Sequence, residues 1–151
     1  MKTTAERRPL AALYAGLALT VLAALAPLVD AATLDLVGDH VRAAYPDWPA
    51  DQVRLDRTAI VGWVAVTNAL GIPLWLWTIR LVAKDRRRAR TVATWSFVAG
   101  ACLALTTLGF GGEHYETVVP LVFGLIGLLP PAAGLAALVP LWRDRTAVAA
   151  R

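Results

Sequence analysis

Four long stretches without a charged side chain dominate this chain of 151 residues. They cover residues 10–29, 58–79, 91–111 and 118–142, and each has about the twenty residues that a helix needs to cross the hydrocarbon core of a bilayer. Each stretch is apolar around its whole circumference, as is typical of helices in lipid or in a fully buried position. In lipid, only helices and closed barrels satisfy the backbone hydrogen bonds, and continuous apolar runs of this kind indicate helices.

The composition agrees with four membrane spans. Hydrophobic residues make up 58% of the chain and charged residues 17%, with a mean hydropathy of +0.56, whereas a soluble domain has about 25% charged residues. The sequence therefore predicts an all-α integral membrane four-helix bundle, with residues 1–151 forming a single domain. The first stretch is longer than the about 7–15 apolar residues of a secretory signal. We expect it to stay as a span; the alternative is cleavage after Ala31, which would leave three spans.

Positive charge is concentrated on alternate connections between the spans. Twelve of the fifteen Lys and Arg residues lie in the N-terminal tail, the connector 80–90 and the tail 143–151. The loop 30–57 has six Asp against three Arg, and the loop 112–117 has two Glu and no basic residue. Because Lys and Arg are enriched in cytoplasmic segments, we expect both termini and the connector in the cytoplasm. Arginine outnumbers lysine thirteen to two, which is typical of GC-rich genomes, so we expect the inner (plasma) membrane of a bacterium.

The connector 80–90 contains a cluster of cations that, out of context, resembles a nucleic-acid site. A connector this short between two spans leaves little room for a nucleic acid, and no aromatic residue interleaves the charges to stack on bases. We therefore expect no nucleic-acid binding, and instead contact with anionic lipid headgroups, at about 1 kcal/mol per basic residue. The cluster, called the basic cluster below, consists of Lys84, Arg86, Arg87, Arg88 and Arg90. Four tryptophans are expected at the same headgroup depth: Trp75, Trp77, Trp95 and Trp142.

The loop 30–57 contains a short amphipathic pattern. Apolar residues recur at helical spacing from Leu34 to Ala44, opposite charged ones, which predicts a short amphipathic helix in this first outer loop. The helix is expected to end at Tyr45-Pro46, and a second helix is expected to begin at Pro49 and to run into the second span. We expect the apolar face of the short helix to rest on the membrane surface. A lid or a docking site for a protein partner are the alternatives.

The four predicted spans contain no Asp, Glu, Lys, Arg or His residue. Since such residues mark ion and proton pathways at bilayer depth, their absence from the sequence of the spans disfavours an ion-coupled pump or exchanger. Asn68 is the most polar side chain there. We expect its amide to form a hydrogen bond with a neighbouring helix, worth about 1 kcal/mol; contact with a substrate is the alternative.

Prolines interrupt the second and fourth spans. Pro73, Pro130 and Pro131 each lack the N–H that would bind the carbonyl one turn earlier, so kinks are expected at these positions. A binding cavity between the two interrupted spans is the alternative, because broken helices in corresponding positions of two halves can mark a transporter site. In the other two spans, small residues at every fourth position favour close helix packing: Ala12, Gly16, Thr20 and Ala24, then Ser96, Gly100 and Ala104.

Residues capable of catalysis or metal binding are few. Four side chains of the outer loops form the only group of interest: His40, Glu113, His114 and Glu116. Imidazole and carboxylate ligands suit Zn²⁺, but the spacing matches no known ligand pattern, so we expect solvated loop residues and no metal or other cofactor. The single cysteine, Cys102, lies in the middle of a span, where a thiol is unreactive. We find no catalytic motif and expect no enzyme activity.

The stretches "KDRRRARTVATWSF" and "GLIGLLPPAAGLAALVPLW" resemble a broad class of small uncharacterised four-span bacterial inner-membrane proteins, a class that implies no functional residues. Three functional hypotheses follow from the sequence. The first is a non-enzymatic accessory or interaction subunit that contacts a protein partner. The second is a small homo-oligomeric transporter or channel with a cavity at the kinked second and fourth spans. The third is a membrane enzyme or metal site at the outer loops.

Overall fold

The computed structural model describes the backbone of residues 4–149, and the side chains of residues 10–142 other than those of positions 83 and 86. All the regular secondary structure of the described chain is helical, as predicted. Its helices are α1 (Thr4–Ala32), α2 (Leu36–Ala44), α3 (Ala50–Ala69), α4 (Gly71–Lys84), α5 (Arg86–Gly109) and α6 (Leu121–Ala149). Four segments are long and apolar enough to cross a membrane: Leu10–Ala32, Ala50–Val82, Arg87–Gly109 and Leu121–Trp142. The predicted bundle of four spans is confirmed.

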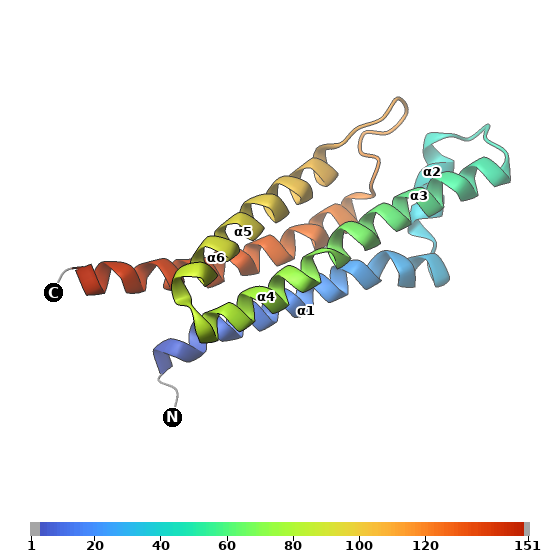
Figure 1. Ribbon diagram of the computed structural model, residues 1–151. Helices are drawn as coiled ribbons and strands as arrows, with labels where there is room; N and C mark the ends of the chain where they lie inside the picture. The colour runs from blue at the N-terminus through green and yellow to red at the C-terminus, as the bar shows by residue number, and fades with distance from the viewer. Residues whose placement is uncertain (1–3, 150–151) are drawn as a thin grey trace.

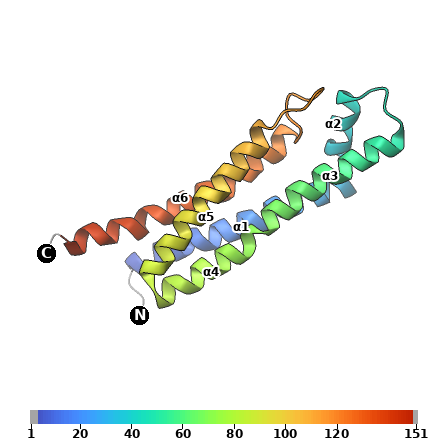
Figure 2. The same ribbon diagram turned by 45° about the horizontal axis from the view of Figure 1, so that its top comes forward.

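The helices form an elongated bundle with two distinct ends (Figure 1). Both ends of the described chain and the α4–α5 turn lie at one end, called the terminal end below, and α2 and the loop 110–120 lie at the other, called the loop end. The helix α1 packs against α3, α4 and α6, whereas α5 packs against α4 and α6 but not extensively against α3. Figures 1 and 2 both show α5 diverging from α3 toward the loop end. The bundle is therefore less tightly closed along this line than along its other sides.

The second span consists of two helices. Pro73 has no N–H to donate to the carbonyl of Ala69, and the helix is interrupted there at Leu70. Leu70 keeps helical dihedral angles (φ −61°, ψ −22°), so α3 and α4 continue as one span. In contrast, α6 remains helical through Pro130 and Pro131.

The connector between the second and third spans is much shorter than the sequence indicated. The helices α4 and α5 extend into it, and only Asp85 lies outside them. The Asp85 side chain accepts hydrogen bonds from the backbone N–H groups of Arg87 (3.0 Å) and Arg88 (3.1 Å). This is the arrangement of a helix N-cap, which satisfies N–H groups that have no partner within the helix. The basic cluster therefore belongs to two helix ends and not to a loop.

The amphipathic helix predicted in the first outer loop is confirmed as α2. Its first N–H groups, those of Leu36 and Val37, donate to the carboxylate of Asp30 (3.0 and 3.2 Å), so the end of α1 caps α2. The expectation that α2 rests on the membrane surface is wrong, because Val37 and Val41 of its apolar face are 1% and 0% exposed and belong to a core cluster, and α2 packs against α3 and α1. Packing against protein buries this face more completely than a membrane surface would.

The core of the bundle is divided into two clusters. The loop-end cluster joins α2, α3 and the start of α6, and consists of Val37, Val41, Val53, Ile60, Val61, Val64, Val119 and Phe123. The terminal-end cluster joins α1, α4, α5 and α6, and consists of Leu13, Val82, Ala89, Ala93, Ala137, Leu138 and Leu141. Between the two clusters the bundle is not filled, and this region holds the candidate site.

Candidate functional site

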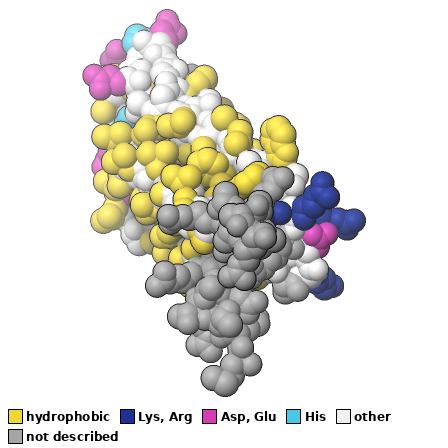
Figure 3. All heavy atoms as spheres, turned by 90° about the vertical axis from the view of Figure 1, so that its left-hand side faces the viewer, with side chains coloured by type: hydrophobic (Ala, Val, Ile, Leu, Met, Phe, Trp, Pro, Cys, Tyr) yellow, Lys and Arg dark blue, Asp and Glu magenta, His cyan; other side chains and the backbone are white. Residues whose placement is uncertain are grey.

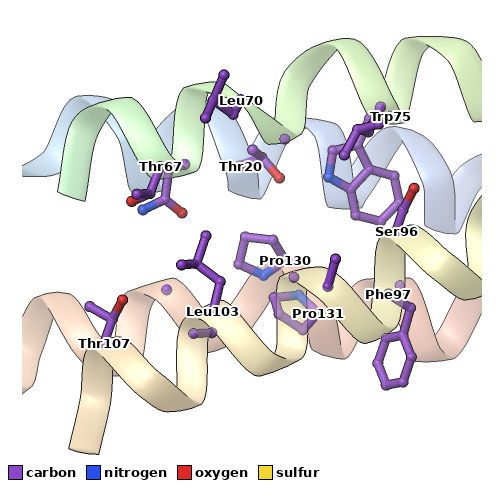
Figure 4. A pocket seen from close by; sticks show the side chains of 18 of the residues that line it. Thr20, Thr67, Leu70, Trp75, Ser96, Phe97, Leu103, Thr107, Pro130 and Pro131 are labelled. Carbon is purple, nitrogen blue, oxygen red and sulfur yellow. The ribbon is translucent and has the colours of Figure 1, made fainter. Parts of the chain in front are cut away.

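A cavity of about 210 Å³ lies in the middle of the bundle. Residues of α1, α3, α4, α5 and α6 line it, and Figure 4 shows side chains of α3 and α4 facing those of α5 and α6 across it. Its volume is below the range of about 300–1,000 Å³ that is typical of sites for drug-sized ligands. The cavity is thus suited to a small molecule or to one chain of a larger one.

Both ends of the cavity are closed by packed apolar side chains. Val64 and Phe123 line it and belong to the loop-end cluster. Leu13, Ala93 and Ala137 line it and belong to the terminal-end cluster. The side between α3 and α5, where the two helices do not pack extensively, is therefore the least obstructed direction of access, and it faces the lipid.

The residues at this side are themselves only partly covered. Leu70, at the α3–α4 junction, lines the cavity and is 64% exposed. Leu103 of α5 lies across the cavity from it and is half-buried (Figure 4). Because an exposed apolar side chain lines the cavity here, this edge of the cavity borders the hydrocarbon of the bilayer.

Polar groups that line the cavity mostly bond to their own helices. The hydroxyl of Thr20 donates to the carbonyl of Gly16 (2.8 Å), and that of Thr67 to the carbonyl of Trp63 (2.6 Å). Asn68 donates through Nδ2 to the carbonyl of Val64 (2.8 Å). The expectation that Asn68 bonds to a neighbouring helix is therefore wrong. Within the described residues, its Oδ1 atom has no hydrogen-bond partner, because the amide faces the cavity.

The two ends of the cavity differ in character. Thr67 and Thr107 lie toward the loop end, with Asn68 beside Thr67 in the sequence, whereas Trp75 and Phe97 lie toward the terminal end (Figure 4). Among the residues whose side chains the structure describes, none that lines the cavity is charged. The site therefore has a neutral polar end and an aromatic end, and suits a neutral molecule with one polar group.

The structure separates the proline residues that the sequence singled out. Pro130 and Pro131 line the cavity together with Asn68. Pro73 does not line it and is exposed, because it lies on the outer face of α4. The break between α3 and α4 is thus near the cavity, whereas the ring of the proline that causes it faces lipid.

Trp75 is the lining residue that the sequence analysis placed wrongly. We expected it at headgroup depth with three other tryptophans, but its ring is turned into the bundle, where it contacts the terminal-end cluster. Trp77, Trp95 and Trp142 are 54%, 70% and 45% exposed. A large ring requires small residues across from it, and two glycines, Gly16 and Gly134, lie opposite Trp75. They are the signal in the sequence that could have indicated the inward position of the ring.

The two ribbons of small residues have different roles. In α1, Gly16, Thr20 and Ala24 are buried, which confirms the expected close packing. In α5, Ser96, Gly100 and Ala104 line the cavity instead, and a Cβ atom added at Gly100 would meet no atom within 4 Å. The small residues of α5 therefore leave space and do not bring helices together.

The loop residues considered as metal ligands are not brought together. His40 donates through Nε2 to the carbonyl of Thr117 (2.8 Å) and stacks on Tyr115, with ring centroids 5.1 Å apart. His114 lies edge-on to Tyr45, and both Glu113 and Glu116 are exposed. Among the described residues, no group of three or more His, Cys, Asp or Glu side chains is placed to hold a metal ion.

A hydrogen bond connects the loop 110–120 to α3, in addition to the contact of this loop with α2. The hydroxyl of Tyr115 donates to Oδ2 of Asp56 (2.7 Å). Burial raises the pKa of Tyr115 above its ordinary value, and the hydrogen bond to Asp56 adds to the effect. The Tyr115 hydroxyl thus stays protonated at neutral pH and keeps this donor role.

An ion-pair cluster holds the loop end together around Asp35. Its carboxylate pairs with Arg57 of α3 and with Arg42 of α2 (3.1 Å), and Arg57 also donates to the carbonyl of Ala31. Partial burial opposes ionisation of Asp35, but hydrogen bonds from the two arginines outweigh it and lower its pKa below 3.8. Because the pKa of Asp35 is lowered on folding, its ion pairs stabilise the folded state fully at pH values above the ordinary pKa of Asp. This contribution is lost as the pH falls through the lowered pKa.

Basic and acidic side chains gather in different regions of the molecular surface. Figure 3, viewed from the terminal end, shows Lys and Arg gathered in one region and most acidic and His side chains in another, with hydrophobic side chains between them. At the terminal end, the guanidinium carbon of Arg90 lies 5.9 Å from the centroid of the Trp142 ring, and Trp142 Nε1 donates to the Thr94 hydroxyl (3.4 Å). These contacts join α5 to α6 where the basic cluster ends.

Comparison with protein-family models, curated proteins and solved structures gives no significant match to this chain.

Proposed function

We propose that this integral membrane protein binds a neutral, mainly apolar chain that it takes from the bilayer into its central cavity. The observation that carries the proposal is a cavity between two packed apolar clusters, with its least obstructed side between α3 and α5. A molecule already dissolved in the hydrocarbon reaches this side directly. A molecule from water would have to pass through one of the two clusters.

The chemistry of the lining supports the same class of ligand. The described lining is apolar except for hydroxyl and amide groups and the indole N–H of Trp75, and none of its described residues is charged, so desolvation of a charged ligand would not be compensated there. Among the described lining residues there is no carboxylate, imidazole or thiol. We therefore propose a binding protein and not an enzyme. The closed ends favour binding over a continuous aqueous channel.

The orientation and the lipid contacts complete the proposal. We place the protein in the inner membrane of a bacterium, with both termini and the basic cluster in the cytoplasm, on the distribution of Lys and Arg. Arg87 and Arg88 are exposed at the terminal end, where anionic lipid headgroups would neutralise them.

The proposal is tested by filling the cavity from two different helices. Gly100 of α5 and Gly127 of α6 both line the cavity, and a Cβ atom at either would meet no atom within 4 Å. Gly100→Leu and Gly127→Leu are expected to reduce saturable binding at least tenfold, which corresponds to about 1.4 kcal/mol, because the leucine side chains occupy the ligand's volume. The measurement is scintillation proximity counting of tritiated decanol on the protein in phosphatidylcholine nanodiscs.

A matched control is available on α3. Gly62 has equal room for a Cβ atom but does not line the cavity, so Gly62→Leu is expected to bind as the wild type does. Unlabelled decanol in excess defines the fraction dissolved in lipid. Absence of saturable binding in the wild type, or equal binding in all three variants, would contradict the proposal.

A second candidate function is a subunit that contacts a partner through α5. In the span formed by α5, only 11% of the residues are buried within the chain, against 33% in the spans of α1 and α6. Cys102 lies on this helix and is exposed. If α5 contacts a partner or a second copy, a photoreactive benzoylphenylalanine at position 102, irradiated in native membranes, should link the chain to a product of defined mass, because its reaction does not require a thiolate. A monomer that stays unlinked after irradiation, compared with the same sample kept dark, would contradict this function.

A further inference from the structure

The ring of Trp75 crosses the bundle at the aromatic end of the cavity. Figure 4 shows its ring extending from α4 into the bundle, and its outer ring atoms lie beside Gly16 of α1 and Gly134 of α6. A Cβ atom added at Gly16 would lie 2.3 Å from Cη2 of the ring, whereas one at Gly134 would lie 3.6 Å from the same atom. The ring is therefore pressed against α1 and has ordinary contact distance to α6.

The space behind the ring is also part of the cavity. Leu13, Ala93 and Ala137 line the cavity and belong to the terminal-end cluster, against which Trp75 packs. Two of these three residues are alanines. The ring thus lies between the cavity and these small side chains, which are called the floor below. A chain that enters the cavity from its polar end contacts the ring before it can reach the floor.

The opposite end of the cavity is suited to the polar group of such a chain. Asn68 and Thr67 of α3 and Thr107 of α5 lie there, at the side where the two helices do not pack extensively. A hydroxyl group placed between them finds an amide and hydroxyl oxygens within the membrane. Since the cavity is too small for a large ring system, a single unbranched chain with a neutral hydroxyl head fits it best.

We propose that the ligand is a neutral single-chain alcohol and that Trp75 sets the length of chain that the cavity accepts. The hydroxyl binds near Asn68, and the chain extends toward the ring of Trp75, which stops it. This inference rests on the proposed function and adds the class of ligand and the residue that determines its length.

The test is competition by a series of unlabelled alkanols, from hexanol to tetradecanol, against tritiated decanol in the nanodisc assay. In the wild type, affinity should rise with chain length beyond the gain from partitioning into lipid, and then fall by at least tenfold once the chain exceeds the cavity. In Trp75→Ala this fall should move to longer chains, because the floor behind the ring becomes accessible. Trp75→Leu is a milder variant that should move it in the same direction. Matching alkyl methyl ethers should bind at least tenfold more weakly than the alkanols, because they lack the hydroxyl proton.

Gly16 and Gly62 provide a matched pair for the position of the ring, because neither glycine lines the cavity. Gly16→Ala should force the ring into the cavity and move the preferred length to shorter chains, whereas Gly62→Ala, where an added Cβ atom would meet no atom within 4 Å, should leave it unchanged. In a Trp75→Leu background, Gly16→Ala should have a much smaller effect, since the ring that it displaces is gone.

The outcomes separate the two levels of the proposal. If no alkanol or ether binds saturably to the wild type, the proposed function fails. If alkanols bind but the preferred length is the same in Trp75→Ala and Trp75→Leu, the role of Trp75 is wrong while the proposed function stands. If ethers bind as tightly as alkanols, the alcohol class is wrong.

Discussion

Replacement of all five residues of the basic cluster by glutamine is expected to invert the α4–α5 hairpin in a large fraction of the molecules. The cluster holds five of the twelve basic residues assigned to the cytoplasmic side: Lys84, Arg86, Arg87, Arg88 and Arg90. Without them, this connection would retain only Arg80 and Asp85, so the charge bias that sets its orientation would be lost. The attraction to anionic headgroups, about 1 kcal/mol per basic residue, would be lost with it.

The orientation is measured by labelling in intact cells. A single cysteine at position 113, in a Cys102→Ala background, reports on the loop 110–120 through its reaction with a membrane-impermeant maleimide. A variant with lysine at all five positions keeps the charge and should label as the parent does. If the glutamine variant also labels as the parent does, the remaining charges suffice for orientation, and the basic cluster would be better explained as a binding surface for a partner.

Arg57→Met is expected to lower the free energy of unfolding by about 2–3 kcal/mol, the range for loss of a partly buried, charged hydrogen-bond donor. Arg57 is 24% exposed and binds both Asp35 and the carbonyl of Ala31, which links α3 to the end of α1 and to the segment between α1 and α2. Removing the guanidinium leaves the Asp35 carboxylate with Arg42 as its remaining partner. Because that carboxylate is partly shielded from water, the loss is larger than for an exposed ion pair.

The measurement is thermal unfolding in detergent, combined with hydrogen–deuterium exchange of α2. Exchange should increase in α2, since the Asp35 cluster and the cap from Asp30 hold this helix on the bundle. Arg54 provides the control: it is exposed on the same helix and forms no ion pair with a described residue. If Arg57→Met is no more destabilising than Arg54→Met, the cluster does not hold the loop end together.

The elements of the fold could be predicted because their signals are local. Uninterrupted apolar stretches determined the four spans, and the spacing of apolar residues around Val37 and Val41 determined α2. Pro73 also had the local effect expected of it, the break between α3 and α4. Asp85 carries an equally local signal, since Asp favours N-cap positions, and reading it as a cap would have shortened the predicted connector.

The candidate site could be predicted only in part. Asn68, Pro130 and Pro131 were singled out for their chemistry, and all three line the cavity. The direction in which Trp75 points had no local signal. In a helix that is apolar all round, the face toward lipid and the face toward protein have the same hydropathy, so the sequence leaves the rotation of the helix about its axis undefined.

The sequence by itself determined that this protein is a bundle of four apolar spans with a small helix at one end, because helix length and hydropathy depend only on neighbouring residues. Tertiary structure alone decided that the core divides into two clusters with a cavity between them. That division depends on residues distant in the sequence, such as Trp75 beside Gly16, and Phe123 and Val64 in the same core cluster. Whether small residues such as those of α1 and α5 bring helices together or leave space depends on what lies opposite them, and only packing decides that.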